Sequence, residues 1–439
     1  MDSYTTNEPI YALATPYAPS ALAIIRASGE HSLSLLSPFF SRKKRLLNAE
    51  SGTLLHGYIS NKEEKRVDEV VLSIYKEGHG YTGEEAFEIT CHGSLAGIKE
   101  LMLVLREAGF REALPGEFTF RAFMHGRMDL TQAEAVEEII ASKSFKSQSL
   151  ALDRLEGRLG KALGAIKDEI LYILASLEVQ LDYAEDEIPE EWVFPFAKVN
   201  SIEERLKKIV STYSSSRLYQ DGAKVVLAGA TNAGKSSLFN LLVKEERAIV
   251  SSIPGTTRDF IEAWCEIGAF PVRLYDTAGL RESEDVIESE GIKRSERLIE
   301  EADIVIFLVD PKDPVLPTNV NNKMIIVWSK DDEGISHKGL SISSLTGDGI
   351  ASLIKEIEKR LSENITISDG ELAIDSKRQK EDIEACLEAL EEAKRSANLS
   401  YDIIALCFQM ALSAIGRITG ETTNEELLDK LFSEFCVGK

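Results

Sequence analysis

The sequence is poor in cysteine, and its few cysteines form no metal-binding or disulfide pattern. Five are spread over 439 residues, and no two of them form a C-x-x-C pair. An odd number of scattered cysteines argues against both a disulfide framework and a zinc site. The five are Cys91, Cys265, Cys386, Cys407 and Cys436.

Basic side chains are also scarce. Lys and Arg number 50 against 73 Asp and Glu, which gives a formal net charge of −23. Affinity for nucleic acid comes largely from neutralisation of phosphates by basic side chains, so this balance argues against a nucleic-acid surface that covers much of the chain. If the partner is RNA, we expect a local basic patch or a second, more basic subunit to hold it.

The sequence also shows no pattern typical of a targeting or membrane segment. The first residues, Met-Asp-Ser-Tyr-Thr-Thr-Asn-Glu-Pro, lack the basic region and apolar core of a signal peptide. No apolar run approaches the length of a membrane span. We therefore expect a cytoplasmic protein with no membrane partner.

The apolar content of 44% is enough for real cores, and the length predicts two to four domains. Residues 1–121 mix strand-like and helical runs, which predicts an α+β domain. Strands are expected at 10–14, 21–25, 70–75 and 86–90, and a helix at 98–108.

The pattern becomes helical over residues 122–219, with helices expected at 133–141, 149–181 and 202–212. Strands and helices alternate over 220–366, as in a nucleotide-binding α/β domain, with strands expected at 224–229, 260–267, 271–276, 304–310 and 323–329. Helices return within 367–439, at 375–397 and 401–415. The pattern predicts a multidomain chain in which the α/β domain is inserted into a discontinuous α-helical domain.

The most informative string is Gly229-Ala-Thr-Asn-Ala-Gly-Lys-Ser236, which follows an apolar strand and precedes a helix. This is the context that a phosphate-binding loop requires. Its backbone N–H groups would face nucleotide phosphates, Lys235 would reach the terminal phosphates, and the Ser236 hydroxyl would bind Mg²⁺. A plain glycine turn is the alternative for this string alone.

Further strings follow in the order found in GTPases. Gly255-Thr-Thr-Arg-Asp259 is expected to be a switch that closes over the γ-phosphate and Mg²⁺. Asp276-Thr-Ala-Gly279 ends a strand, where a carboxylate reaches the Mg²⁺ shell. Leu280 stands where many GTPases have the glutamine that orients water, so another group must do this; Glu282, Glu284 and Glu288 are candidates.

The guanine-reading string is Ser329-Lys-Asp-Asp332, after the strand that ends at Trp328. Asp332 is expected to accept two hydrogen bonds from guanine, while Ser329 replaces the usual asparagine. Together the strings predict a Ras-like α/β P-loop GTPase domain. The expected GTP contacts are Asn232, Ala233, Gly234, Lys235, Ser236, Ser237, Thr256, Thr257, Asp276, Thr277, Ala278, Gly279, Ser329, Lys330, Asp332, Ser343, Ser344 and Leu345.

With these strings in place, the whole chain resembles the MnmE (TrmE) family. The resemblance extends to the N-terminal strings Tyr81-Thr-Gly-Glu-Glu85, Leu114-Pro-Gly-Glu-Phe-Thr119 and Met128-Asp-Leu-Thr-Gln-Ala-Glu-Ala-Val136. The last residues, Phe435-Cys-Val-Gly-Lys439, are close to the family's Cys-Ile-Gly-Lys terminus.

The resemblance implies a homodimer formed through N-terminal folate-type domains. Such proteins join an FAD-dependent MnmG-type partner in a heterotetramer, act on tRNA, and help install an aminomethyl-type group at carbon 5 of the wobble uridine. The implied cofactors are GTP, Mg²⁺, K⁺ and a tetrahydrofolate derivative that supplies one carbon.

The resemblance also implies roles for individual residues. Potassium would be bound by Asn232, Ser251, Ile253 and Thr256, and magnesium by Ser236 and Thr257. Glu288 would orient the attacking water, and Cys436 matches the family's C-terminal cysteine. Folate would contact Arg26, Glu88, Arg127 and Lys439. Arg127 stands where lysine is common, and the two side chains are not geometrically equivalent.

Two alternatives remain open. A GTP-dependent RNA or ribosome assembly factor would suit the phosphate loop and Leu280 equally well, although it needs no folate site. A weakened GTPase kept as a scaffold is suggested by Ser329 alone. Arg26, Glu88 and Cys436 also have purely structural interpretations, as a solvated strand end, a water-facing strand residue and a small buried apolar group.

Overall fold

The computed structural model describes residues 4, 6–182, 192–245, 261–277, 297–335, 338–363, 365, 367 and 371–439. The chain forms two compact units. The first comprises Met1–Glu137, Leu155–Asp168 and Leu412–Lys439, and the second comprises Glu138–Arg154 and Glu169–Ala411. The expectation of a multidomain chain is confirmed.

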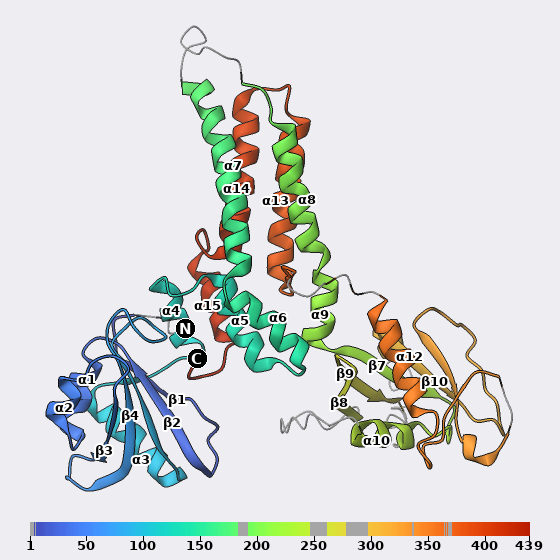
Figure 1. Cartoon of the computed structure of the whole chain (residues 1–439), viewed down its shortest axis with the longest axis horizontal. Helices are drawn as coiled ribbons and strands as arrows, with labels where there is room; N and C mark the ends of the chain where they lie inside the picture. Colours follow the sequence, from blue (N-terminus) through green and yellow to red (C-terminus); the bar gives the residue numbers. More distant parts are fainter. Residues whose placement is uncertain are drawn as a thin grey trace, which may run out of the picture. The chain divides into compact units, whose positions relative to one another are not determined.

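The first unit is built on a six-stranded sheet of order β3-β4-β5-β2-β1-β6. All neighbours are antiparallel except β1 and β6. Helix α3 (Leu95–Ala108) packs on one face and buries Ile98, Leu101 and Leu105 in the main core (Figure 1). The strands are β1 (Ile10–Leu13), β2 (Ser20–Ser28), β3 (Leu54–Ser60), β4 (Arg66–Tyr75), β5 (Ala86–Gly93) and β6 (Arg111–Glu112).

The four strands expected in this region are confirmed as β1, β2, β4 and β5, but β3 was not expected from the sequence. Gly57 lies in the middle of β3, and glycine weakens strand propensity. A Cβ atom there would lie 2.6 Å from the Phe40 ring, so the absence of a side chain lets Phe40 approach the strand. Short helices α1 (Ser32–Leu36) and α2 (Lys43–Leu47) flank Phe40 on either side along the chain.

The C-terminal segment packs within this same unit. Helix α15 (Glu425–Ser433) contacts α4 (Glu117–Met124), and Phe120, Phe432 and Phe435 share a buried aromatic cluster. Gly116, with φ of 68°, has the Phe432 carbonyl oxygen 2.5 Å from where a Cβ would be. Only glycine lets the two segments approach this closely.

The second unit contains a six-stranded sheet of order β12-β11-β10-β7-β9-β8, parallel except for β8 (Figure 1). The five expected strands are confirmed within two residues. They are β7 (Ala223–Gly229), β8 (Ile261–Ile267), β9 (Phe270–Asp276), β10 (Ile304–Val309) and β11 (Met324–Trp328), with β12 (Leu340–Ser341) added at the edge. Helices α9 (Tyr213–Asp221), α10 (Lys235–Glu245) and α12 (Ile350–Ser362) contribute to its core.

The remaining helices are α5 (Leu130–Ala141), α6 (Phe145–Leu155), α7 (Arg158–Asp182), α8 (Phe196–Ser211), α13 (Lys377–Arg395) and α14 (Tyr401–Thr419). Helices α8 and α13 precede and follow the α/β sheet in sequence and pack against each other. The single helix expected over 149–181 is wrong, because the chain turns at Gly157 with φ of 75° between α6 and α7.

Among the described residues, one helix is long and apolar enough to span a membrane by length and composition alone. It is α14, of 19 residues, and half of its most apolar stretch is buried within the protein. The expectation that no apolar run approaches this length is therefore wrong. Core helices of globular proteins have the same composition, and Phe408, Ala411 and Ile415 of α14 are buried.

Candidate functional site

The phosphate loop lies at the carboxyl end of β7, where parallel sheets bind ligands. Gly229 has φ of 135°, and a Cβ there would lie 2.3 Å from the Leu308 carbonyl oxygen of the neighbouring strand. Asn232 and Gly234 also have positive φ, of 63° and 91°. This run of left-handed backbone turns the chain sharply into α10, as a loop that offers N–H groups to phosphate requires.

Lys235 and Ser236 begin α10 and lie against the end of the sheet. The Lys235 Nζ donates to the carbonyl oxygens of Gly229 and Ala230, at 3.0 and 2.7 Å. The Ser236 hydroxyl donates to Asp276 Oδ2 at 2.7 Å, and Asp276 is 1% exposed. The structure thus brings together the two oxygen ligands expected near Mg²⁺, a hard cation that prefers such donors.

The base-side strings also meet. The Ser343 hydroxyl donates to Asp332 Oδ1 at 2.5 Å and accepts from the N–H groups of Leu345 and Thr346, at 3.2 and 3.1 Å. This contact fixes the Asp332 carboxylate through Oδ1. The side chain is exposed, so Oδ2 can accept a hydrogen bond from a ligand. Ser344 and Leu345 follow in the same turn, and Leu345 is 84% exposed.

Ser329 is buried and donates to the Val309 carbonyl oxygen at 3.2 Å. Gly234 of the phosphate loop lies beside it, since a Cβ on Gly234 would be 3.8 Å from Ser329 Cβ. Lys330, in the left-handed region with φ of 58°, pairs with Asp310, and this ammonium group lowers the pKa of the Asp310 carboxyl. The sequence did not single out Asp310, because the pair joins the ends of two different strands.

Several expected residues lie outside the described residues. They are Ser251, Ile253, Thr256 and Thr257 of the first switch, Ala278 and Gly279, and Glu288. Thr277 is described, and its hydroxyl donates to the Leu227 carbonyl oxygen at 2.8 Å. Ala233 is fully buried, and Ser237 lies in α10 beyond Ser236.

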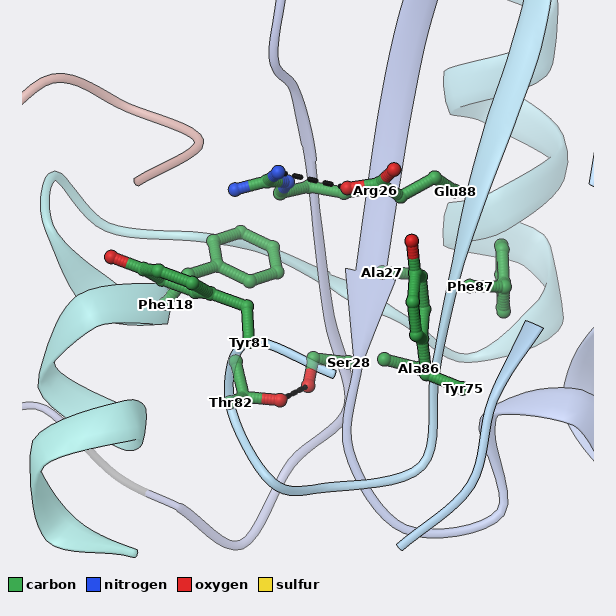
Figure 2. A pocket seen from close by; sticks show the side chains of 10 residues that line it. All are labelled: Arg26, Ala27, Ser28, Tyr75, Tyr81, Thr82, Ala86, Phe87, Glu88 and Phe118. Atoms are coloured by element: carbon green, nitrogen blue, oxygen red, sulfur yellow. Dashed lines mark hydrogen bonds and ion pairs between the residues drawn. The ribbon is translucent and has the colours of Figure 1, made fainter. Parts of the chain in front are cut away.

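A second site lies in the first unit, where a pocket of about 100 Å³ opens between β2, β5 and the loop before β5. Arg26 donates to Glu88 Oε1 at 2.8 Å from one strand to the next, because the two residues pair in register. Figure 2 shows this ion pair along one edge of the pocket, with the Tyr81 and Phe118 rings on one side and the Tyr75 ring on the other.

The C-terminal residues complete the surroundings of Arg26. Its second guanidinium nitrogen donates to the Gly438 carbonyl oxygen at 2.9 Å. The Lys439 Nζ lies 5.8 Å from the centre of the Tyr81 ring, and Arg26 Cζ lies 5.7 Å from it. Burial and the Arg26 charge lower the pKa of Lys439, whereas burial raises the pKa values of Tyr81 and Tyr75.

Three of the four residues expected to contact folate therefore lie together: Arg26, Glu88 and Lys439. Arg127 does not line the pocket, and its guanidinium donates to the carbonyl oxygens of Gly78 and Gly80 at 3.3 and 3.2 Å. Cys436 is exposed with a free thiol, and its backbone carbonyl accepts from Gly116 N at 3.3 Å.

Sequence reasoning missed the aromatic walls of this pocket. Tyr81 and Phe118 lie inside the strings Tyr81–Glu85 and Leu114–Thr119, which were noted for their resemblance and not for a site. Two aromatic residues within polar, glycine-containing strings were the available signal. Ser28 and Thr82, whose hydroxyl oxygens are 2.6 Å apart, line the floor and carried no such signal.

Sequence comparison with known proteins finds similarity to one family over nearly the whole chain. Family models match residues 9–127, as the GTP-binding protein TrmE N-terminus, and residues 130–436, as the MnmE helical domain. The tRNA modification GTPase MnmE of Treponema denticola is 40% identical over 468 aligned positions and 99% of both chains. The proteins of the same name from Borreliella burgdorferi and Aquifex aeolicus are 39% and 37% identical and cover 99% of this chain.

Among solved structures, the G domain of the T. maritima FeoB iron transporter is 26% identical to this chain. It covers 32% of this chain and 98% of its own, with a TM-score of 0.24. The family assignment rests on the sequence matches, which extend through both units. This chain belongs to the MnmE family.

Proposed function

We propose that this chain is the GTP-hydrolysing component of a system that installs a (carboxymethyl)aminomethyl group at carbon 5 of the tRNA wobble uridine. It acts with an FAD-dependent partner of the MnmG type. The observation that carries the proposal is the Ser236–Asp276 pair beside the phosphate loop, in a chain that is 40% identical over its length to a tRNA modification GTPase.

In the GTPase reaction, the described residues bind and orient the nucleotide. The Lys235 ammonium group would leave the loop carbonyls and contact the terminal phosphates. Ser236 and Asp276 would hold Mg²⁺, which would offset the charge that develops during phosphoryl transfer. Asp332, fixed by Ser343, selects guanine. Thr257 adds a magnesium ligand, and Glu288 orients the attacking water.

We also assign a potassium ion to the phosphate loop. The left-handed backbone at Asn232 supports this, since a non-glycine residue with φ of 63° is uncommon and its side chain is available as an oxygen ligand. Ser251, Ile253 and Thr256 would complete the ligand set. A cation beside the phosphates would take the place of an arginine finger.

The pocket around Arg26 would hold the ring end of a tetrahydrofolate derivative. Its chemistry fits, because the Glu88 carboxylate can accept N–H donors of a pterin ring, and Tyr81 and Phe118 offer faces for a flat heterocycle. Lys439 and Arg127 carry the charge that suits an acidic tail. When bound, the cofactor would supply one carbon to the uridine. The exposed, free thiol of Cys436 is our candidate for a reactive group in that step.

The proposed organisation has four parts: 1–121 for folate binding and dimerisation, 122–219 and 367–439 as one helical domain, and 220–366 as an inserted GTPase domain. Packing of α8 against α13 supports the insertion, since these helices flank the sheet in sequence. We propose that the homodimer joins its FAD-dependent partner in a cytoplasmic heterotetramer.

The deciding experiment measures wobble-uridine nucleosides by mass spectrometry in cells that lack their own family member and express this chain. Restored aminomethyl-type modification is expected, and Lys235→Ala should abolish it. If the wild-type chain is folded and bound to the host's flavoprotein yet restores nothing, the proposal is wrong and the alternative of an RNA or ribosome assembly factor is favoured.

Potassium dependence is tested on the purified chain. GTP turnover should be faster in potassium than in sodium at equal ionic strength, and Asn232→Ala should remove the difference. Equal turnover in both salts would remove potassium from the proposal without affecting the modification role.

A further inference from the structure

The first unit displays an unusual concentration of positive charge for so acidic a chain. Four consecutive residues, Arg42, Lys43, Lys44 and Arg45, are all exposed and lie at the start of and along α2. We refer to these four side chains as the α2 basic cluster. Among the described residues, no ion pair joins any of them to a carboxylate.

Several other exposed basic side chains of the protein are neutralised by neighbouring carboxylates. On α8, for example, Arg205 pairs with Glu169 and Lys208 pairs with Glu371, at 2.6 and 2.9 Å. Such exposed pairs contribute little stability, but they cancel the local field. The positive electrostatic field of the α2 basic cluster is not cancelled by such pairs. This distinguishes the cluster from a charge run on an ordinary solvated surface.

The cluster is held on a firm support. Phe40, Leu46 and Ala49 are buried in the main core of the sheet, one before, one within and one after the basic run. Gly57 of β3 leaves room for the Phe40 ring, and Ser41 exchanges hydrogen bonds with the backbone of Tyr58 at 3.0 and 2.9 Å. The four charges therefore project from a fixed turn.

A groove of about 490 Å³ runs beside the cluster. Lys44 and Arg45 line it together with Asn48 and Thr53, whose amide and hydroxyl groups can donate to phosphate oxygens. Glu50 is the one carboxylate in its lining, so the two positive charges of Lys44 and Arg45 face one negative charge there.

An aromatic and basic pair adjoins the cluster on β3 and β4. Arg66 Cζ lies 3.6 Å from the centre of the Tyr58 ring, and Tyr58 is the residue bonded to Ser41. Basic groups interleaved with an aromatic ring suit single-stranded or looped RNA, which binds through phosphates and stacked bases.

We propose that the α2 basic cluster and its groove bind the phosphate backbone of the RNA substrate. This inference rests on the proposed function, which supplies tRNA as that substrate. It also explains how a chain with a net charge of −23 can bind RNA: through a local patch whose charges pair with no carboxylate in the described part of the chain.

The test uses the full-length chain and an unmodified tRNA transcript, with the dissociation constant measured over a range of salt concentrations. The variant Lys44→Gln/Arg45→Gln should weaken binding about 10-fold near 0.1 M salt, and the slope of log K against log salt should fall in magnitude by about 2. The control Lys62→Gln/Lys65→Gln removes two charges that pair with Glu107 and Glu63, and it should change both quantities much less.

GTP turnover should be unchanged in both variants, since neither touches the nucleotide site. Unchanged tRNA affinity and slope in Lys44→Gln/Arg45→Gln, or an equal loss in the control, would overturn the proposal. The proposal would also be overturned if Lys44→Gln/Arg45→Gln bound tRNA normally but lost binding to anionic lipid vesicles or to the flavoprotein. If the Lys44→Gln/Arg45→Gln variant binds tRNA with normal affinity and still modifies it in cells, the α2 basic cluster is not the RNA-binding site. The proposed function would be unaffected by that result.

Discussion

The proposed selection of guanine nucleotide depends on single side chains, and Asp332 is the clearest case. Its carboxylate is fixed by the Ser343 hydroxyl at 2.5 Å and retains a second acceptor for guanine. Asp332→Asn replaces an acceptor by a donor, so GTP binding should weaken roughly 100-fold while XTP, which has a carbonyl oxygen at the same ring position, should gain. Competition against a fluorescent guanine nucleotide measures both changes.

The neighbouring Asp331→Asn is the matched control, since Asp331 is also exposed and carries the same charge. Equal losses of GTP affinity in the two variants would show that charge alone matters and would remove the base-reading role. The sequence predicted the role of Asp332 from its place after a strand. It could not predict the Ser343 contact, which joins loops 11 positions apart.

Gly157 illustrates how one residue divides an element. Its φ of 75° lies in the left-handed region, and a Cβ would lie 3.2 Å from Gln132 Nε2, which donates to Leu155 O. Gly157→Ala should destabilise the protein by about 1–2 kcal/mol in denaturant unfolding. Gly164→Ala lies within α7 with open space around it, and should instead stabilise by about 0.5–1 kcal/mol.

If Gly157→Ala proved as benign as Gly164→Ala, the turn between α6 and α7 would not depend on glycine. The apolar spacing over 149–181 predicted one continuous helix because periodicity carries no information about φ. A lone glycine within a helical pattern is tolerated in many helices, so the sequence did not reveal this break. The same limit hid β3, where Gly57 serves a close approach.

At the scale of elements, α5, α6 and the segment before α13 are joined by a buried charge cluster. Arg154 pairs with Glu138 and with Asp375 Oδ2, the latter at 2.6 Å, and all three side chains are at most 10% exposed. Burial, together with the Asp375 charge, raises the pKa of the Glu138 carboxyl well above its ordinary value, although Arg154 acts in the opposite direction.

A raised folded-state pKa has a definite sign for stability. The proton that Glu138 retains stabilises the fold fully below the ordinary pKa of 4.5, and this contribution is lost as pH rises through the raised folded value. Glu138→Gln keeps a neutral acceptor for Arg154, so its stability should fall less than that of the wild type as pH rises from 5 to 8. Chemical unfolding at several pH values measures this.

The exposed Glu178→Gln should follow the wild-type pH profile. Parallel profiles for all three proteins would mean that Glu138 is ionised in the folded state throughout this range. This cluster could not be predicted from the sequence, because its members are separated by 16 and 221 positions and only the fold brings them together.

At the scale of the whole molecule, the sequence predicted the order and position of strands better than it predicted single contacts. Five α/β strands were placed within two residues, since apolar runs bounded by polar strings mark strands. The ends of β7 at Gly229 and of β9 at Asp276 were also marked by the nucleotide-binding strings. The pocket around Arg26 is the opposite case. Residues of β2, β4, β5, α4 and the loop before β5 line it, the C-terminal residues contact Arg26, and only the family resemblance linked Arg26, Glu88 and Lys439.

Each compact unit has its own sheet and its own buried core, so each should unfold in its own cooperative transition. Guanine nucleotide with Mg²⁺ at about 100 times its dissociation constant stabilises the unit it binds by about 2.7 kcal/mol. For a unit of this size, the corresponding shift is roughly 5–10 °C in one transition of a calorimetric scan.

The transition of the α/β unit should respond to nucleotide, and that of the N-terminal unit to a reduced folate. Lys235→Ala should lose the first shift and keep the second, while Glu88→Gln should do the reverse, because the two substitutions lie in different sites of different units. A single transition that moves with either ligand would contradict independent unfolding. A nucleotide shift that survives Lys235→Ala would contradict the phosphate loop as the binding site.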